Sequence, residues 1–275
     1  MRINADTLVE TNRLYLVPYC KFHVTQYHQW MLSESLRQAT CSEQLSLEEE
    51  HEAQRLWQEL DDRLTFIVLN KATILSSVNI GNLCETYVVP EDVEVKAMIG
   101  DVNMFITDYD GSDILCARAL HINLGDYTPK DNETYFEAEV SVMIADENVR
   151  GRGLAAEALA GMLEFASKHL LLKPYSLVAK VSVDNPGSMR LFKDHFGFVE
   201  RARQEVFHQV ELVPPPDLFS RVAPTTPEKK FKPDDLLAAT STLIVNSLAQ
   251  TSKEFRGVDW IYHEKDVNKW RKGLI

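Results

Sequence analysis

Residues 135–145 read YFEAEVSVMIA, and residues 150–166 read RGRGLAAEALAGMLEFA. In the first stretch apolar and polar side chains alternate, which predicts a half-buried strand with Ala138 and Ile144 on one face and Glu139 on the other. In the second stretch apolar residues recur at three- and four-residue intervals, which predicts a helix. A strand, a glycine-rich turn and a helix therefore follow one another at the centre of the chain, and this unit decides the fold.

The turn between strand and helix has the composition of an anion site. Glycines let a backbone approach an anion closely, and the first N–H groups of a helix point towards it. Arg150 and Arg152 would add positive charge suited to a phosphate. Short patterns of this kind also occur in ordinary turns and in RNA-binding tails, so the turn alone leaves these alternatives open.

Downstream, the sequence predicts a second strand, a short helix and a final pair of strands. Tyr175 to Val183 predicts a strand parallel to the first, because a helix connects the two. Asn185 followed by a proline is typical of a helix start. We expect this helix to end near His195, whose side chain would pack or cap there, and the last strands to run from Gly197 to Val213.

Upstream, alternating or apolar runs predict strands over residues 13–19, 64–69 and 97–106. Helices are expected over residues 21–32 and from Ser46, where Glu49 completes a capping box. Residues 71–95 predict an irregular loop, and residues 107–133, rich in Asp and Gly, predict a long insertion.

Composition excludes several classes of protein. The 275 residues are 45% hydrophobic and 25% charged, which is ordinary for a folded domain, and the net charge of −12 argues against nucleic acid as a partner. Four widely spaced cysteines suggest neither a disulfide framework nor a zinc site. Because neither a signal peptide nor an apolar run of membrane-spanning length is found, we expect a cytoplasmic protein, or a nuclear one, without a membrane partner.

Acidic residues gather in one part of the chain. Residues 85–140 hold thirteen Asp and Glu against three Lys and Arg. The plainer interpretation is a solvated surface that aids solubility. The sharper one is an acidic rim that attracts a cationic substrate.

Two separated motifs resemble the GNAT superfamily of acetyl-CoA-dependent N-acetyltransferases. The family's Gln/Arg-x-x-Gly-x-Gly/Ala signature is matched by Arg150, Gly153 and Ala155, and its later Asn and Ser helix ending in Gly-Phe is matched by NPGSMRLFKDHFGF over residues 185–198. Within the superfamily the chain looks closest to the N-acetyltransferase 9-like group, which includes alpha/beta-tubulin N-acetyltransferases. The supporting segments are LVPY (16–19), WMLSE (30–34), TFIVL (65–69), GDVNMF (100–105) and VMIA (142–145).

The resemblance implies an α+β fold, in which a mixed central sheet flanked by helices splays open after the strand at 135–145. Acetyl-CoA would bind as co-substrate, with its pantetheine arm in the gap. The residues implied to bind it are Met143, Ile144 and Ala145 beside the arm, Arg150, Gly151, Arg152, Gly153, Leu154 and Ala155 at the pyrophosphate, and Asn185 and Ser188 on the other side. A plain helix cap is the alternative role for Asn185.

Acetyl transfer needs a free amine, a nearby thioester and a group that accepts the amine's proton. Glu139 is the favoured base, at the spacing from Arg150 at which some family members carry a catalytic Glu, and Asn185 is the second candidate catalytic residue. Glu137 on the same strand face is a rival for Glu139, and an exposed strand carboxylate is the alternative for both. Many family members carry a Tyr that protonates the leaving thiolate. Phe192 stands at that position here, so no general acid is predicted.

We therefore expect a GNAT domain over residues 1–213, a Pro-rich linker over 214–233 and a C-terminal tail over 234–275 with a helix at 235–249. The expected reaction transfers acetyl to a protein amine, at an N-terminal α-amine such as that of tubulin, with tubulin or microtubules as partner. The alternative is a catalytically weak acetyl-CoA-binding scaffold or microtubule regulator. A monomer without a metal ion is expected.

Overall fold

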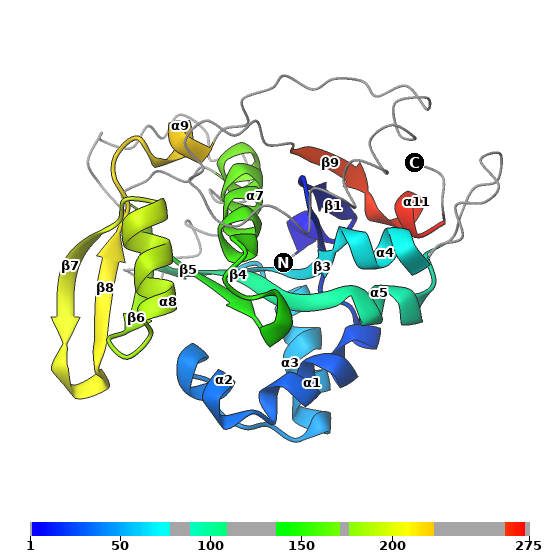
Figure 1. Cartoon of the computed structure of the whole chain (residues 1–275), viewed down its shortest axis with the longest axis horizontal. Helices are drawn as coiled ribbons and strands as arrows, with labels where there is room; N and C mark the ends of the chain where they lie inside the picture. The colour runs from blue at the N-terminus through cyan, green and yellow to red at the C-terminus, as the bar shows by residue number, and fades with distance from the viewer. Residues whose placement is uncertain (1, 78–88, 109–135, 171–175, 223–261, 273–275) are drawn as a thin grey trace.

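The computed structural model describes residues 2–77, 89–108, 136–170, 176–222 and 262–272 (Figure 1). These residues form a nine-stranded sheet with the order β7-β8-β6-β5-β4-β3-β2-β1-β9. The strands are β1 (Thr7–Glu10), β2 (Leu14–Pro18), β3 (Arg63–Asn70), β4 (Met98–Asp108), β5 (Phe136–Ile144), β6 (Leu177–Ser182), β7 (Val199–Gln204), β8 (Gln209–Val213) and β9 (His263–Asp266). Neighbouring strands are antiparallel except β5 and β6, which are parallel as predicted.

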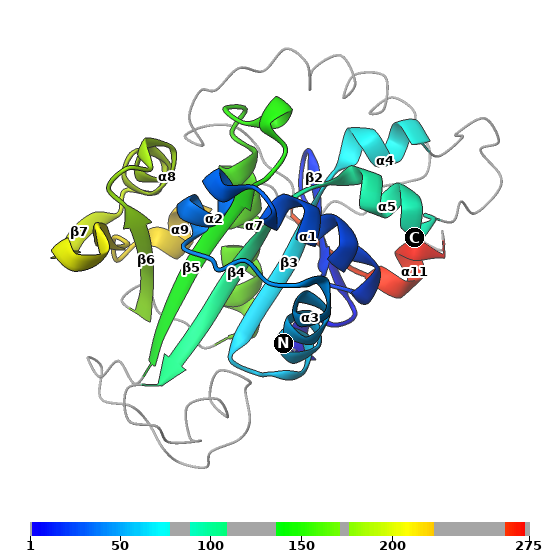
Figure 2. The same ribbon diagram turned by 90° about the horizontal axis from the view of Figure 1, so that it is seen from below.

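Helices cover both faces of the sheet (Figure 2). They are α1 (Val24–Met31), α2 (Glu34–Thr40), α3 (Leu47–Glu59), α4 (Lys71–Ser77), α5 (Glu91–Ala97), α7 (Leu154–His169), α8 (Pro186–Arg190), α9 (Leu218–Val222) and α11 (Val267–Arg271). The mixed α+β fold is thus confirmed. Within the described ranges, no helix combines the length and the apolarity that a membrane crossing needs.

Alternation along β5 divides the core into two layers. Ala138 and Val140 pack with α7 on one face of the sheet, whereas Met143 packs on the other face with side chains of α1, α5 and α11. The predicted facing of this strand is therefore confirmed. Burial of apolar side chains on both faces is the main stabilising term, because each buried Leu, Val or Phe contributes about 1.5–3 kcal/mol.

The predicted start of α3 is also confirmed. The Ser46 hydroxyl accepts the Glu49 N–H at 3.3 Å, and the Glu49 carboxylate accepts the Ser46 N–H at 2.8 Å. This reciprocal pair satisfies two backbone donors that a helix N-terminus otherwise leaves without partners.

The loop predicted over residues 71–95 is wrong at both ends. Residues Lys71–Ser77 form α4, and residues Glu91–Ala97 form α5. Acidic side chains fill the first turn of α5, where they complement the positive end of the helix dipole, and Val93 and Ala97 are buried four residues apart. Each helix has only seven residues, too few for apolar periodicity to stand out in the sequence.

The C-terminal residues contribute the outermost strand on one side. β9 pairs antiparallel with β1 from Thr7↔Asp266 to Glu10↔His263, and α11 follows it directly. Trp270 of α11 is 1% exposed, and its ring lies 5.1 Å from that of Tyr15. β9 and α11 lie in the predicted tail and α9 in the predicted linker, whereas the helix expected at 235–249 lies outside the described residues. The predicted domain boundaries stay predictions.

A buried ionic cluster fixes α11 to the rest of the domain. The Glu94 carboxylate lies 2.9 Å from His23 Nε2 and 2.8 Å from a guanidinium nitrogen of Arg271. Burial alone would raise the pKa of Glu94, but hydrogen bonds with His23 and Arg271 outweigh it and lower that pKa. Breaking such a buried pair leaves an uncompensated charge, which makes the cluster costly to disrupt.

We expect Trp270→Ala to lower the free energy of unfolding by about 3–5 kcal/mol, because it leaves a large cavity in a closed core. Urea denaturation followed by circular dichroism would measure the loss. Lys269→Ala changes an exposed neighbour and is the matched control. Equal stability of the two variants would show that α11 does not contribute to the core.

Candidate functional site

The glycine turn has the geometry that an anion site requires. Gly151 and Gly153 have φ angles of 73° and 75°, a region that favours glycine. Gly153 is the N-cap of α7, and no side chain caps the first N–H groups of the helix in the part of the chain that the structure describes. These backbone donors are therefore left for another acceptor, at the positive end of a 16-residue helix.

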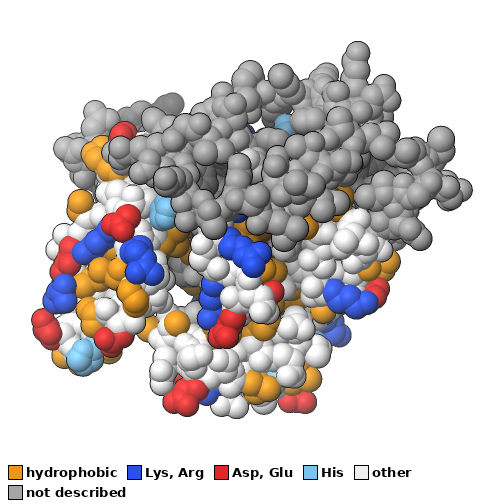
Figure 3. Space-filling model, in the orientation of Figure 1, with side chains coloured by type: hydrophobic (Ala, Val, Ile, Leu, Met, Phe, Trp, Pro, Cys, Tyr) orange, Lys and Arg blue, Asp and Glu red, His pale blue; other side chains and the backbone are white. Residues whose placement is uncertain are grey.

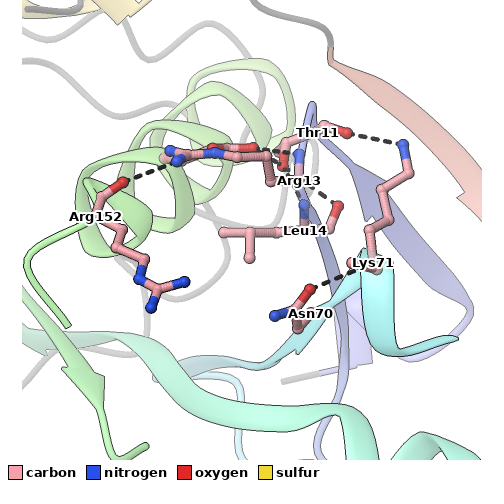
Figure 4. Close-up of polar contacts among 8 residues, drawn as sticks. Thr11, Arg13, Leu14, Asn70, Lys71 and Arg152 are labelled. Atoms are coloured by element: carbon pink, nitrogen blue, oxygen red, sulfur yellow. Dashed lines mark hydrogen bonds and ion pairs between the residues drawn. The ribbon is translucent and has the colours of Figure 1, made fainter. Parts of the chain in front are cut away.

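A buried carboxylate in the first turn of α7 anchors this turn to the sheet. Glu157, 4% exposed, accepts hydrogen bonds from the Thr11 hydroxyl, the Arg13 backbone N–H and Arg13 Nε, each at 2.7 Å. A second guanidinium nitrogen of Arg13 donates to the Arg152 carbonyl at 2.8 Å. Figure 4 shows Arg13 bound to the Arg152 carbonyl, while the Arg152 side chain points away from it. The connection from β1 to β2 thus holds the glycine turn in place.

Neither Glu157 nor Arg13 was predicted as a site residue from the sequence. An acidic residue in the first turn of a helix is common because it complements the helix dipole, so Glu157 gave no signal of its own. Arg13 lies 144 residues away in sequence. Only the folded sheet brings the two together.

Arg150, predicted to bind the pyrophosphate, also has contacts within the chain. Its guanidinium donates to the carbonyls of Ile144 at 2.7 Å and Ala145 at 3.0 Å, and lies 3.2 Å from the Glu147 carboxylate. These contacts tie the end of β5 to the glycine turn. Arg150 therefore shapes the turn, whereas the exposed Arg152 side chain is the one placed to add charge.

The sheet opens beside β5, as predicted. In the described chain, β5 and β6 pair only at Ala138↔Leu177 and Glu139↔Val178, after which β6 pairs with β8. The Ala145 N–H donates to the Ile99 carbonyl at 2.8 Å. Because alternate residues of an antiparallel strand direct their backbone groups to opposite edges, those of Ile144 face the open edge. Of the three residues predicted along the arm, Ile144 is thus the one with backbone groups directed into the opening.

A close approach between backbones fixes the position of β5. A Cβ atom placed on Gly100 of β4 would lie 1.9 Å from the Met143 carbonyl oxygen. Only glycine therefore permits β4 and β5 to pair at this point. Met143 itself packs its side chain on the sheet face opposite α7.

Across the opening, the predicted helix cap is present. Asn185 Oδ1 accepts the Ser188 N–H at 3.0 Å, which leaves the amide NH₂ of Asn185 as a donor. Phe192 is 3% exposed and packs on Phe198 with 5.2 Å between ring centroids. His195 is exposed rather than packed, because Phe192 and Phe196 supply the apolar contacts of this turn.

The two candidate bases both have cationic neighbours. Glu139 lies 2.7 Å from Lys180 Nζ, and Glu137 lies 2.7 Å from a guanidinium nitrogen of Arg201. Figure 3 shows Lys and Arg side chains interspersed with Asp and Glu over the β7 and β8 end of the molecule. As a general base, Glu139 would have to share its carboxylate between Lys180 and the incoming amine.

Most described acidic residues of the predicted rim are engaged or buried. Asp92 pairs with Lys96 at 3.0 Å, and Asp101 is 1% exposed. Together with the pairs made by Glu94, Glu137 and Glu139, this leaves little unbalanced acid on the described part of the region. Residues 109–135, which hold much of the remaining acid, lie outside the described ranges.

A buried polar cluster on the sheet face opposite α7 is a further feature that the sequence analysis missed. The Asp101 carboxylate accepts from the Tyr27 hydroxyl at 3.1 Å and from the Asn103 amide at 2.7 Å. Burial raises the pKa of Asp101 to about 6, although both hydrogen bonds act to lower it. The available signal was the motif GDVNMF, which places Asp and Asn inside an otherwise apolar strand.

Within the described ranges, no group of three His, Cys, Asp or Glu side chains is arranged to hold a metal ion. Cys20 and Cys41 are both free. The chemistry available at the site is therefore that of backbone donors, carboxylates and cationic side chains.

Comparison with known proteins gives consistent matches. A family model described as the acetyltransferase (GNAT) domain matches residues 13–199. The chain is 39% identical over 215 residues to alpha/beta-tubulin-N-acetyltransferase 9 of Drosophila melanogaster, covering 78% of this chain and 90% of that protein. It is 36% identical over 214 residues to the Homo sapiens protein of that name (77% and 84% covered) and 35% identical over 224 residues to an N-acetyltransferase 9-like protein of Schizosaccharomyces pombe (77% and 97%).

We expect Glu157→Gln to destabilise the protein by about 3 kcal/mol, because an amide has one accepting oxygen where Glu157 uses two, and because a buried charge network loses its centre. Thermal unfolding would measure the loss, and hydrogen exchange should show faster opening of residues 150–155. Glu52→Gln, at an exposed ion pair, should leave the midpoint unchanged. An unchanged midpoint for Glu157→Gln would contradict the anchoring role.

Proposed function

The chain belongs to the GNAT acetyltransferase family, and from that premise we propose that it transfers the acetyl group of acetyl-CoA to the N-terminal α-amine of a protein such as tubulin. One observation carries the proposal: an uncapped helix N-terminus, preceded by two glycines with positive φ, lies beside the open edge of β5. The pyrophosphate of acetyl-CoA needs N–H donors such as those at the start of α7, and its amide-bearing arm needs a strand edge next to them.

Binding of acetyl-CoA would use the backbone more than charged side chains. The N–H groups from Gly151 to Ala155 would hold the pyrophosphate, with Arg152 as the nearest mobile cation. The outward N–H of Ile144 would donate to a carbonyl of the arm, as in a neighbouring strand, while the Ile144 carbonyl already accepts from Arg150. The Asn185 amide and Ser188 would border the arm on its other side.

The transfer step requires a neutral amine, which attacks the thioester carbonyl carbon as the bond to sulfur breaks. A base must take the ammonium proton first, and Glu139 is the proposed acceptor, directly or through a water. Lys180 holds that carboxylate at 2.7 Å and would orient it towards the opening. As the amide forms, the nitrogen loses its second proton to solvent. Because Phe192 cannot protonate the departing thiolate, solvent is also the proposed source of the proton that the thiolate takes up.

The proposed acceptor follows from the relatives. Two of the similar proteins are named as acetyltransferases of alpha/beta-tubulin. We propose a protein amine of this kind as acceptor, and a cytoplasmic location where tubulin would be met. The choice of an α-amine over a Lys side chain is part of the proposal.

A second candidate function is a catalytically weak acetyl-CoA-binding scaffold or microtubule regulator. Two observations favour it: Phe192 has no hydroxyl to act as a general acid, and both candidate bases are ion-paired. Such a protein would bind acetyl-CoA through the same glycine turn and turn over slowly.

Mass spectrometry of tubulin and of its N-terminal peptides after incubation with acetyl-CoA tests the acceptor. We expect a single acetyl group on the α-amine, and a loss of rate of about 100-fold in Glu139→Gln if that carboxylate is the base. Glu137→Gln is the matched control and should keep most of the rate. Binding of acetyl-CoA without product, unchanged by Glu139→Gln, would favour the scaffold.

Gly153→Asp should weaken acetyl-CoA binding at least ten-fold more than Gly153→Asn, because the two side chains differ in charge while sharing shape and tolerance of positive φ. Isothermal calorimetry would measure both dissociation constants. The Gly153→Asn variant therefore controls for the backbone strain that any side chain introduces at this positive φ angle. Equal constants for the two variants would place the pyrophosphate elsewhere.

A further inference from the structure

A cavity of about 210 Å³ lies on the sheet face opposite α7, between α1, α3 and the segment that joins α2 to α3. Figure 2 shows these helices covering the sheet on that side. Its lining combines aromatic, acidic and small side chains: Tyr19, Tyr27, Met31, Ser42, Glu43, Leu45, Glu50, Ala53 and Trp57. Among the residues that the structure describes, no Lys or Arg lines it.

Three aromatic rings form one wall. Tyr19 lies 5.2 Å from Tyr27 and 6.2 Å from Trp57, measured between ring centroids. The Tyr27 hydroxyl is held by Asp101, which fixes its ring. The Tyr19 side chain is buried, and its hydroxyl has no hydrogen-bond partner among the residues that the structure describes. Faces of such rings attract cations, and an orphaned hydroxyl in a cavity is a donor or acceptor for a ligand.

A buried acid forms the opposite side. Glu50 of α3 is 5% exposed, and it lines the cavity. Burial raises the pKa of Glu50, while the charge of His28 acts to lower it. A carboxylate partly removed from water is a favourable counter-ion for a bound cation.

We propose that this cavity binds the positively charged side chain of a Lys or Arg close to the acetylated end of the acceptor, with Glu50 as its counter-ion and Tyr19, Tyr27 and Trp57 as its aromatic walls. The proposal rests on the proposed function, because it assigns the substrate specificity of that same enzyme.

The size of the cavity limits the occupant. Sites for whole drug-sized molecules occupy roughly 300–1,000 Å³, so this cavity holds one side chain rather than a nucleotide or an acetyl-CoA arm. A neutral apolar side chain would fill the space but offer no charge to Glu50 and no hydrogen-bond partner to the Tyr19 hydroxyl. A cationic side chain would pair with the Glu50 carboxylate and would also be attracted to the faces of the aromatic rings.

The position of the cavity relates it to the acetyl donor. Tyr27 reaches Asp101 of β4, which is the partner of Met143 on β5. Strands are spaced by about 4.8 Å, so the open edge of β5 is roughly 10 Å from Asp101. An extended peptide advances about 3.3 Å per residue. About three extended residues span that distance, so we place the occupant of the cavity among the first few residues that follow the acetylated amine.

Synthetic peptides with a free N-terminus test this directly. Each carries one Arg at position 2, 3 or 4, and a matched peptide has citrulline, its neutral analogue, at the same place. For the wild-type protein we expect kcat/KM about ten-fold or more higher for Arg than for citrulline at one of these positions. Glu50→Gln should remove that preference while the citrulline peptide keeps its rate.

Glu48→Gln, an exposed acid on the same helix outside the cavity, is the matched control and should retain the preference. Equal rates for Arg and citrulline at all three positions, or a preference that survives Glu50→Gln, would overturn the inference while leaving the proposed function standing. Acetylation of no peptide would instead contradict the proposed function. Calorimetric binding of the same peptides would then decide the inference, because Arg must still bind more tightly than citrulline and only when Glu50 is present.

Discussion

The carboxylate of Glu157 holds together two parts of the chain that are distant in sequence, residues 11–13 and residues 152–157. It binds the hydroxyl of Thr11 and both the backbone and the side chain of Arg13, and Arg13 in turn binds the carbonyl of Arg152. The start of α7 and the glycine turn are thereby set against the β1–β2 connection. Since Arg150 ties the same turn to the end of β5, the helix N-terminus and the open strand edge keep a fixed relation to each other.

Under the proposed function, the two faces of the sheet and the opening beside β5 would serve two different chemical tasks. α7 packs on one face and presents its N-terminal amides beside β5, where an anionic donor would bind. The opposite face carries the aromatic and acidic cavity beneath α1 and α3, where a cationic acceptor would bind. Glu139 lies on the strand between them, so the proposed base is at the boundary of the two sites. Side-chain alternation in β5 places Ala138 and Val140 on the face that α7 covers and Met143 on the opposite face.

The features that could be predicted from the sequence are those that depend on residues close together in the chain. The alternation of residues 136–144, the positive-φ glycines, the Ser46 capping box and the Asn185 cap all depend on neighbours within a few positions, and each could be predicted. Glu157, Asp101 and Glu50 could not, because an acid in a helix or strand has the same local pattern whether its partners are water or a residue far along the chain. Arg150 shows the same limit: its charge was evident, but the carbonyls that engage it were not. The short polar strand β9 has no apolar pattern, and its partner lies more than 250 residues away.

The pairing of β9 with β1 also bears on how the chain reaches its native state. Synthesis begins at the N-terminus, so β1 is made first and its outer edge stays unpaired until the ribosome has released residues 263–266. Exposed strand edges are templates for pairing with other chains. Contacts between the two ends of a chain also slow folding, because the closure entropy must be overcome before the contact forms. The pairing of β1 with β9 thus makes completion of the sheet depend on residues more than 250 positions apart, and until they pair the outer edge of β1 is open to other strands.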